Sequence, residues 1–409
     1  MKHKEIFDKA YNRLTELYGD TPDIQIISRF YSEKVFLQER EYIRYLDLFG
    51  RISERASALG EHIRLNGTAG SSFIAYLLGA TKINPLPFHE YCPKCKQLRF
   101  TGEYTPLDRY PPECNCGSDM ICDGYCLPFE MNLRSVFREN IQLGVSRHFF
   151  NEAKAMICEY MSDRSIVTLT GDEDISLTWL CFPDRDENND TVYPLKGNAP
   201  RFASIPHITL APIPMLDKYR ELENATGVKM KDHPDDTGVF SGCFEGEIDG
   251  LPYIGSDFMK ELIKKTKPEP YQGYNEILKL IGLAHGTNVW KGNADKLFEY
   301  HIWSMQDIPA FADDIYEMIC QKLREQGIYE VGFAYEVALK TRQGYYARNG
   351  LDSAVSQRLL DLGFTNDFCG FISKINYMFP KAQAISFLKD DISVMWYKIY
   401  YPEEYSRLF

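Results

Sequence analysis

The sequence predicts an α+β protein in which a mixed α/β first half is followed by an all-helical second half. In the first half, residues 140–145 alternate polar and apolar as a strand does, and residues 63–78 read as a short strand, a glycine-rich loop and a helix. From about residue 215 onward, apolar residues recur at helical spacing, and glycine or proline marks the turns. The boundary between the two halves is expected within residues 212–240.

Length and composition indicate a globular intracellular protein. The chain has 409 residues, of which 44% are hydrophobic and 25% charged, and this length is enough for two or three domains. No run approaches the ~18 apolar residues that a membrane span requires, and residues 1–14 read as an amphipathic helix rather than a signal peptide. We therefore expect a cytoplasmic protein with no membrane partner.

The charge of the chain limits its nucleic-acid partners. The net charge is −12, which argues against a broad nucleic-acid surface because phosphate contacts need clustered lysine and arginine. A local basic groove stays open. The densest basic stretch is interpreted as a solvated helix end, and it consists of Lys260, Lys264, Lys265 and Lys267.

Two helical segments precede the first strand, which is expected at residues 63–65. Residues 4–18 and 29–50 carry the apolar spacing of helices, and residues 19–22 (GDTP) separate them. Asp20 or Thr21 can cap the second helix, and the proline suits a first helical turn.

The strand at 63–65 leads into NGTAGSS, residues 66–72, a loop of small residues that enters a helix. Small residues let backbone N–H groups approach an anion, and a helix N-terminus favours negative charge. The loop lacks the lysine of a P-loop and the glycine spacing of a dinucleotide-binding turn. The alternative interpretation is a tight turn with close helix packing.

Six of the eleven cysteines lie between Cys92 and Cys126, which requires a local explanation. Two closely spaced pairs in a loop-rich segment are typical of a closed, tetrahedral, structural zinc site. The second pair has one intervening residue where two are usual, so Cys122 or Cys126 remains a candidate replacement ligand. Four free buried thiols are the alternative. The predicted ligands are Cys92, Cys95, Cys114 and Cys116.

The strand at residues 140–145 places two amides, Asn140 and Gln142, on one face. Paired carboxylates at this spacing serve metal-dependent enzymes, so the strand is either an ordinary half-buried strand or a catalytic strand without its charge. His285 lies at a helix break, where a lone histidine is more often a capping or core residue than a catalytic one. No hydrolase motif accompanies it.

Several blocks of the sequence resemble the PolC-type family of bacterial DNA polymerase III alpha subunits, in order along nearly the whole chain. They are AYNRLTELYGD, GTAGSSFIAYLLGATKINPLPFHEYCPKC, YCLPFEMNL, HGTNVWKGNADKL and NYMFPKAQA. The resemblance implies a nucleotidyltransferase-like palm of the Pol beta type that carries a zinc module, followed by helical fingers. The implied domains are 1–87 (N-terminal helices and the first part of the palm), 88–126 (zinc insertion), 127–214 (rest of the palm, thumb largely missing) and 215–409 (fingers-like).

The chain departs from this family at the catalytic centre. The family's palm has an Asp-x-Asp strand and a third aspartate on a neighbouring strand, which hold two metal ions. These positions fall on Asn140, Gln142 and Thr209, all of them neutral. Because Mg²⁺ needs anionic oxygen ligands, tight Mg²⁺ binding is not expected. The sequence leaves open whether the chain is an enzyme, and it favours a chain without catalysis. Zinc is the one cofactor predicted.

The resemblance also implies which residues would bind a nucleotide. Two of the family's groups are changed here: Asn66 replaces an arginine before the glycine, which removes a charge-assisted phosphate contact, and Gln383 ends the last block in place of a histidine. The implied nucleotide-binding residues are Asn66, Gly67, Gly70, Ser71, Ser72, His285, Thr287 and Lys381.

Three functions follow from these observations. The first is an inactive homologue of the polymerase core that binds DNA, a nucleotide or a replisome protein. The second is a divergent active polymerase with relocated carboxylates. The third is a purely structural module that binds proteins through its acidic surface. The candidates for relocated carboxylates are Glu139, Asp172, Glu173 and Asp174.

Overall fold

The computed structural model describes residues 2–38, 42–101, 106–108, 111–133, 140–160, 166–170, 175–180, 207–230, 237–269 and 273–409. The fold is α+β and mostly helical. Its described residues form two compact units, one extending to Met230 and the other running from Thr237 to Arg407. Helix α7 (Pro214–Thr226) therefore belongs to the first unit.

Three helices open the first unit: α1 (Lys2–Tyr18), α2 (Ile24–Leu37) and α3 (Tyr42–Ala58). The sequence predicts one helix over residues 29–50, and the structure has two helices there. The apolar residues of both helices are buried in the same core, so their spacing resembles that of a single helix. The cap of α2 is Asp23, not the expected Asp20 or Thr21. The Asp23 side chain accepts a hydrogen bond from the Gln25 amide at 2.8 Å.

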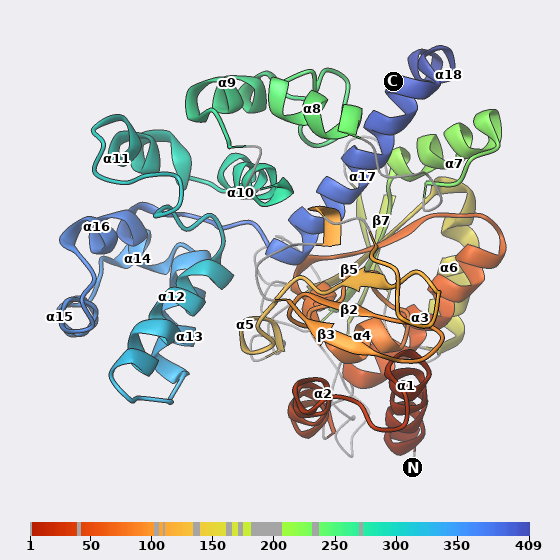
Figure 1. Cartoon of the computed structure of the whole chain (residues 1–409), viewed down its shortest axis with the longest axis horizontal. Helices are drawn as coiled ribbons and strands as arrows, with labels where there is room; N and C mark the ends of the chain where they lie inside the picture. The colour runs from red at the N-terminus through yellow and green to blue at the C-terminus, as the bar shows by residue number, and fades with distance from the viewer. Residues whose placement is uncertain are drawn as a thin grey trace. The chain divides into compact units, whose positions relative to one another are not determined.

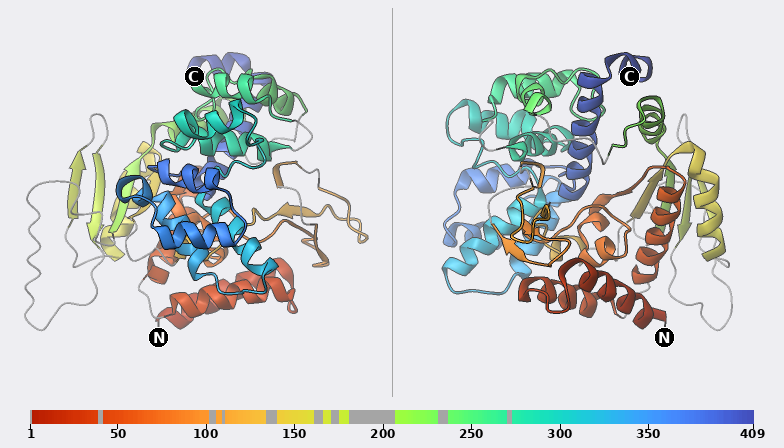
Figure 2. Two further views of the ribbon diagram at one scale, coloured as in Figure 1. Left: turned by 90° about the vertical axis from the view of Figure 1, so that its left-hand side faces the viewer. Right: turned by 45° about the vertical axis from the view of Figure 1, so that its right-hand side comes forward.

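A five-stranded sheet forms the centre of the first unit, in the order β1-β5-β8-β7-β6. Strands β5 and β8 are parallel, and the other neighbouring pairs are antiparallel. Helix α6 (Arg147–Tyr160) follows β5 directly and packs beside α3 against the sheet (Figures 1 and 2). The strands are β1 (Ile63–Asn66), β5 (Asn140–Val145), β6 (Ile166–Thr170), β7 (Ile175–Leu180) and β8 (His207–Pro212).

The glycine loop and a small second sheet lie between β1 and β5 in the chain. The loop is a 3-10 turn, Gly67–Ser71, followed by the short helix α4 (Phe73–Leu77). The second sheet has the order β3-β2-β4 and carries the cysteine-rich segment. Its strands are β2 (His89–Tyr91), β3 (Leu98–Phe100) and β4 (Ile121–Asp123); a 3-10 turn (Pro106–Asp108) and α5 (Glu130–Leu133) complete this region.

A buried polar chain connects helix α1 to this second sheet. Tyr18 Oη lies 3.0 Å from His89 Nε2 and accepts a hydrogen bond from Asn84 Nδ2 at 3.0 Å. Asn84 Nδ2 also donates to Asp123 Oδ2 at 2.8 Å, as does the Tyr76 hydroxyl at 2.7 Å. Burial lowers the pKa of His89, which keeps this fully buried imidazole neutral.

The second unit is built of helices, in agreement with the helical spacing of the sequence after residue 215. The long helix α17 packs against α8 and α10 (Figure 2). Among the described residues, no helix is both long and apolar enough to cross a membrane. The helices are α8 (Thr237–Glu245), α9 (Asp257–Thr266), α10 (Tyr274–His285), a π-turn (Trp290–Ala294), α11 (Asp295–Glu299), α12 (Ala312–Glu325), α13 (Gly332–Arg342), α14 (Tyr345–Asn349), α15 (Ser353–Asp361), α16 (Asn366–Lys374), α17 (Lys381–Tyr400) and α18 (Pro402–Leu408).

Candidate functional site

Three polar residues from neighbouring strands stand in one row across the large sheet. Asn66 on β1 is the register partner of Gln142 on β5, and Gln142 is in turn the partner of Thr209 on β8. Because register partners project their side chains from the same face, these three residues share a face. Asn140 stands two positions before Gln142 and opposite His207. We call Asn66, Gln142 and Thr209 the neutral row.

The neutral row is enclosed and carries no charge. Asn66 and Thr209 are only 7% and 6% exposed, and Gln142 is half-buried. Amide and hydroxyl oxygens are weak ligands for Mg²⁺, which needs carboxylate or phosphate oxygens in a near-octahedral arrangement. These three residues therefore do not fit a pair of divalent cations. Within the described ranges, three or more closely placed Cys, His, Asp or Glu ligands occur at one place, the cysteine cluster.

Asn66 has an unsatisfied polar atom. Its Oδ1 is buried and accepts no hydrogen bond from the residues that the structure describes. A buried acceptor without a donor costs about 1–3 kcal/mol, so the position favours any ligand that brings a donor. Asn66 lies directly before Gly67, whose φ of +78° allows the chain to turn out of the strand.

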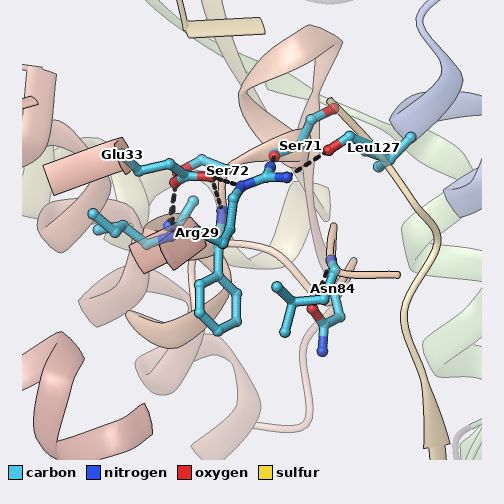
Figure 3. A network of polar contacts seen from close by, with 10 residues as sticks. Arg29, Glu33, Ser71, Ser72, Asn84 and Leu127 are labelled. Carbon is cyan, nitrogen blue, oxygen red and sulfur yellow. Dashed lines mark hydrogen bonds and ion pairs between the residues drawn. The ribbon is translucent and has the colours of Figure 1, made fainter. Parts of the chain in front are cut away.

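The glycine loop is held by a carboxylate from helix α2 (Figure 3). Glu33 is fully buried and accepts hydrogen bonds from the Ser72 hydroxyl at 2.8 Å and from the amides of Phe73 at 2.9 Å and Ile74 at 3.1 Å. The donors at the start of α4 are thus already paired with an internal anion. A phosphate at this loop would have to use donors other than these three.

Arg29 compensates the buried charge of Glu33. Its Nε donates to Glu33 Oε1 at 2.6 Å, and its two terminal nitrogens donate to the carbonyls of Leu127 at 2.8 Å and Ser71 at 2.9 Å (Figure 3). The planar guanidinium is suited to this task because its donors point in fixed, diverging directions. Arg29 therefore fixes the glycine loop to both α2 and the segment before α5.

Four thiols meet beside the small sheet. The Sγ atoms of Cys92, Cys95, Cys114 and Cys116 all lie within 4.8 Å of one another. The Cys92–Cys116 and Cys95–Cys114 sulfur pairs are both 3.5 Å apart. A tetrahedral ion with metal–sulfur bonds of about 2.3 Å requires sulfur pairs roughly 3.8 Å apart, so the cluster has the size of a closed metal site. The four cysteines could hold a metal ion.

Backbone turns shape both cysteine pairs. The Cys92 amide donates to the Gln97 carbonyl at 2.8 Å, and the Cys114 amide donates to the Ser118 carbonyl at 2.8 Å. The amide of Cys95 points at the sulfur of Cys92 and, as the main cause, lowers the pKa of that thiol to about 6. Cys122 and Cys126 are not members of the four-thiol cluster.

Two sequence blocks of the second unit are joined by backbone hydrogen bonds. The Thr287 amide donates to the Tyr377 carbonyl at 2.8 Å, and the Asn376 amide donates to the Thr287 carbonyl at 3.0 Å. His285 lies beside this bridge, with its ring 5.0 Å from the ring of Phe379. Burial lowers the pKa of His285, and its Nδ1 contacts the Ile281 carbonyl at 3.1 Å. The imidazole is therefore packed at a helix end.

Lys381 begins α17 and faces a carboxylate from α12. Its Nζ lies 3.1 Å from Asp314 Oδ1 and 5.9 Å from the centre of the Phe311 ring. The neighbouring Asp313 is 6% exposed, and its Oδ1 has no hydrogen-bond partner among the described residues. Burial raises the pKa of Asp313 to about 6. Lys279 of α10 lies in the same group of charged residues. Lys279, Asp314 and Lys381 line one cavity, which has a volume of about 400 Å³.

The lysines at the end of α9 are largely paired with acids. Lys260 contacts Asp257 at 3.2 Å, and Lys265 forms an ion pair with Glu299 of α11. Lys267 ends the helix in the left-handed conformation. This stretch is thus a helix end with neighbouring carboxylates, as its sequence suggests, and its positive charge is partly neutralised.

Several functional candidates lie outside the described residues: Glu139, Asp172, Glu173 and Asp174. Conversely, sequence reasoning missed Arg29, Glu33 and Asp313. Nothing in the local sequence marks Glu33 as a partner of residues forty positions later. The Arg29–Glu33 spacing of one helical turn is an ordinary surface pattern, so it gives no signal of burial.

Comparison with known proteins finds similarity to bacterial DNA polymerase III alpha subunits. Residues 209–322 match the bacterial DNA polymerase III alpha subunit finger domain. Proteins named DNA polymerase III PolC-type from Caldanaerobacter subterraneus and Staphylococcus saprophyticus are 24% and 23% identical over 95% and 98% of this chain. The corresponding protein from Thermotoga petrophila is 21% identical over 96%. The chain spans about a third of the length of these relatives, 32% to 34%. The chain is therefore a partial homologue of PolC-type DNA polymerase III.

Proposed function

We propose that this chain is a catalytically inactive homologue of the palm and fingers of the PolC-type polymerase that acts by binding DNA or replisome proteins in the cytoplasm. The observation that carries the proposal is the register of Gln142 opposite Thr209, two neutral residues where the family resemblance places metal-binding aspartates. With Asn140, three negative charges are absent from a site meant for two dications. A loss of even ~4 kcal/mol of transition-state stabilisation slows a reaction almost a thousandfold.

In this proposal, a nucleotide would bind through the glycine loop and the helical unit. The proposed loop contacts are Asn66 and the turn formed by Gly67, Gly70 and Ser71, whereas the Ser72 hydroxyl is engaged by Glu33. His285, Thr287 and Lys381 are the proposed contacts of the helical unit. A neutral Asn66 favours a base or ribose over a triphosphate, because it offers no charge to phosphate.

We further propose that the four-cysteine cluster binds zinc in a structural role. The sulfur spacing fits tetrahedral thiolate coordination, and four cysteine ligands leave no coordination position open to a substrate. Zinc would fix the turns at Cys92 and Cys114 and so stabilise the small sheet.

The test of catalysis is primer extension with Mg²⁺ or Mn²⁺ on a labelled primer–template. We expect no nucleotide incorporation above the level of a buffer control. Metal-dependent incorporation that persists in an Asn140→Ala, Gln142→Ala variant and is lost in an Asp172→Ala, Asp174→Ala variant would overturn the proposal in favour of relocated carboxylates.

The test of binding is fluorescence anisotropy with the same primer–template at 20 and 200 mM salt. Binding that weakens steeply with salt is expected, because counterion release dominates nucleic-acid affinity. No binding at the lower salt concentration would remove the nucleic-acid part of the proposal and favour a module that binds proteins alone.

A further inference from the structure

A cavity in the second unit has no part in the site described above. Its volume is about 410 Å³, and it lies between the end of α9, the start of α10 and the loop that follows α11. Glu276 from α10, Phe298 from α11 and the loop residues His301, Trp303 and Met305 line it. Three flat rings and the buried carboxylate of Glu276 thus line a single small volume.

Glu276 carries a buried carboxylate that is paired with no other side chain of the described residues. It is only 6% exposed, and although its amide donates to the Gly273 carbonyl at 3.2 Å, its carboxylate makes no hydrogen bond or ion pair with any residue of the described ranges. Lys279, one turn later on α10, acts on Glu276 through its charge, but its amine donates to the backbone carbonyls of Met305 and Gln306. Burial accordingly raises the pKa of Glu276. A buried carboxylate in this state is stabilised by any cation that enters the cavity.

The loop that forms the cavity wall is held in a fixed shape. His301 has a φ of +57°, a left-handed conformation that is costly for a residue with a side chain. Three hydrogen bonds hold it there: the His301 amide donates to the Phe298 carbonyl at 3.1 Å, and the next two amides donate to the Leu297 carbonyl at 2.9 and 3.1 Å. The ring of Trp303 also packs edge-on against Phe371, with ring centres 5.3 Å apart. The cavity is therefore preformed.

We propose that this cavity binds a guanidinium group, supplied by an arginine side chain of a partner protein or by a small guanidine compound. A planar guanidinium can stack on an aromatic face while it pairs with a carboxylate, and no other biological cation combines both properties so well. A second carboxylate, Glu269, lines the rim and adds negative charge, opposed by Lys267 on the same rim. The net charge of −12 favours the approach of cationic ligands.

Glu276 of the guanidinium site is separate from His285, one of the proposed nucleotide contacts of the helical unit. Glu276 lies in the first turn of α10, whereas His285 is its last residue. At about 1.5 Å per residue, the two are roughly 14 Å apart along the helix. Binding at the cavity can therefore be measured independently of DNA or nucleotide binding, and its failure would leave the proposed function untouched.

The experiment is a fluorine NMR titration of the full chain labelled with 5-fluorotryptophan. Trp303 is one of four tryptophans, and its resonance is identified by its absence from a Trp303→Phe variant. The probe is the blocked peptide Gly-Arg-Gly, and the comparison peptide replaces arginine with citrulline, a neutral group of the same shape. We expect a saturable shift of the Trp303 resonance with the arginine peptide alone. An equal response to the citrulline peptide would overturn the proposal.

Matched variants test which side chains contribute to binding of the arginine peptide. Glu276→Gln is expected to weaken arginine-peptide binding at least tenfold, whereas Glu261→Gln, the same change at an exposed position of α9, leaves it unchanged. Because Glu276→Gln alters a buried group, its fold is checked by circular dichroism. His301→Ala, at an exposed side chain on the rim, serves as a second variant with an expected weakening of several-fold. Unchanged affinity in both the Glu276 and His301 variants would refute the site.

A third arm separates the two sources of the guanidinium group. Ethylguanidinium that binds as tightly as the peptide would indicate a small-molecule ligand, because the peptide backbone then adds nothing. Peptide binding that is at least tenfold tighter would indicate an arginine presented by a partner protein. Both outcomes support the guanidinium site, and no saturable shift with either compound contradicts it.

Discussion

Gln142 and Thr209 face each other across the parallel strands β5 and β8, with Asn66 on the other side of Gln142. Side chains alternate faces along a strand, so a one-residue slip of either strand would move one of these residues to the opposite face. The shared register therefore gives the neutral row a defined geometry, in which the effect of restoring charge can be measured.

Aspartates placed in this geometry should create a Mg²⁺ site. The variant Asn140→Asp, Gln142→Asp, Thr209→Asp is expected to gain a Mg²⁺-dependent rise in Tm that the native chain lacks. Without metal it should be less stable, because like charges at opposite positions of neighbouring strands cost about 0.2–1 kcal/mol per pair. Thermal unfolding with and without 10 mM Mg²⁺ measures both effects. A variant that ignores Mg²⁺ would show that the three positions do not converge.

Removing the charge of Glu33 should destabilise the first unit strongly. Glu33→Gln leaves Arg29 buried beside a neutral amide and gives the Ser72 and Phe73 donors a weaker acceptor. Breaking a buried ion pair by removing one partner costs about 3–5 kcal/mol. Urea unfolding followed by circular dichroism provides the measurement. The control is Glu54→Gln on the exposed face of α3, which should change the free energy of unfolding by less than about 0.5 kcal/mol.

Metal removal should unfold the cysteine-rich segment. If the four thiolates hold zinc, the purified chain contains one zinc per molecule, and a strong chelator lowers its stability, because binding free energy becomes folding free energy. Cys95→Ser should lose the zinc, and Cys126→Ser, outside the four-thiol cluster, should keep it. Elemental analysis and thermal unfolding provide the readouts. A stably folded chain free of metal would contradict the zinc proposal.

The stability of the first unit should fall in mild acid because of His89. Burial holds the pKa of His89 in the folded chain below the ordinary 6.5. Below pH 6.5, the unfolded chain therefore binds a proton at His89 that the folded chain does not bind. This contribution is fully present above pH 6.5 and is lost progressively as the pH decreases. His89→Gln should flatten the pH dependence of the free energy of unfolding between pH 7 and 5, and the exposed His148→Gln should not. Equal slopes for all three proteins would exclude this role.

Two glycine-to-alanine changes should alter the free energy of unfolding in opposite directions. A Cβ at Gly50 of α3 would lie 2.1 Å from the carbonyl oxygen of Leu78, so Gly50→Ala forces α3 and the end of α4 apart, at a cost of about 1–3 kcal/mol. At Gly370 in α16, a Cβ meets no atom within 4 Å, and alanine should stabilise its unit by roughly 0.4–1 kcal/mol. Urea unfolding of each variant tests both. Stabilisation by Gly50→Ala would show that the helices can separate freely.

Features encoded by local pattern could be predicted from the sequence. The alternation at 140–145 gave a strand, the small residues at 66–72 gave a turn before a helix, and the spacing of the cysteines anticipated the four-thiol cluster. The break between α2 and α3 could not be predicted, because both helices bury apolar residues in one core and the periodicity continues across the gap. The burial of Glu276 could not be predicted either, because a glutamate in the first turn of a helix is usually exposed.

The hydrogen bonds that Glu33 accepts from Ser72, Phe73 and Ile74 should also affect the order of folding. The acceptor for the Phe73 amide lies forty residues earlier in the chain, so the start of α4 cannot be completed by local folding. Contacts of such sequence separation require a long chain segment to close, which slows their formation. We therefore expect the loop to become ordered late, after α2 has docked, and amides of Phe73 and Ile74 to gain protection from hydrogen exchange only in the last cooperative step of folding. The loop is thus a reporter of completed assembly in the first unit.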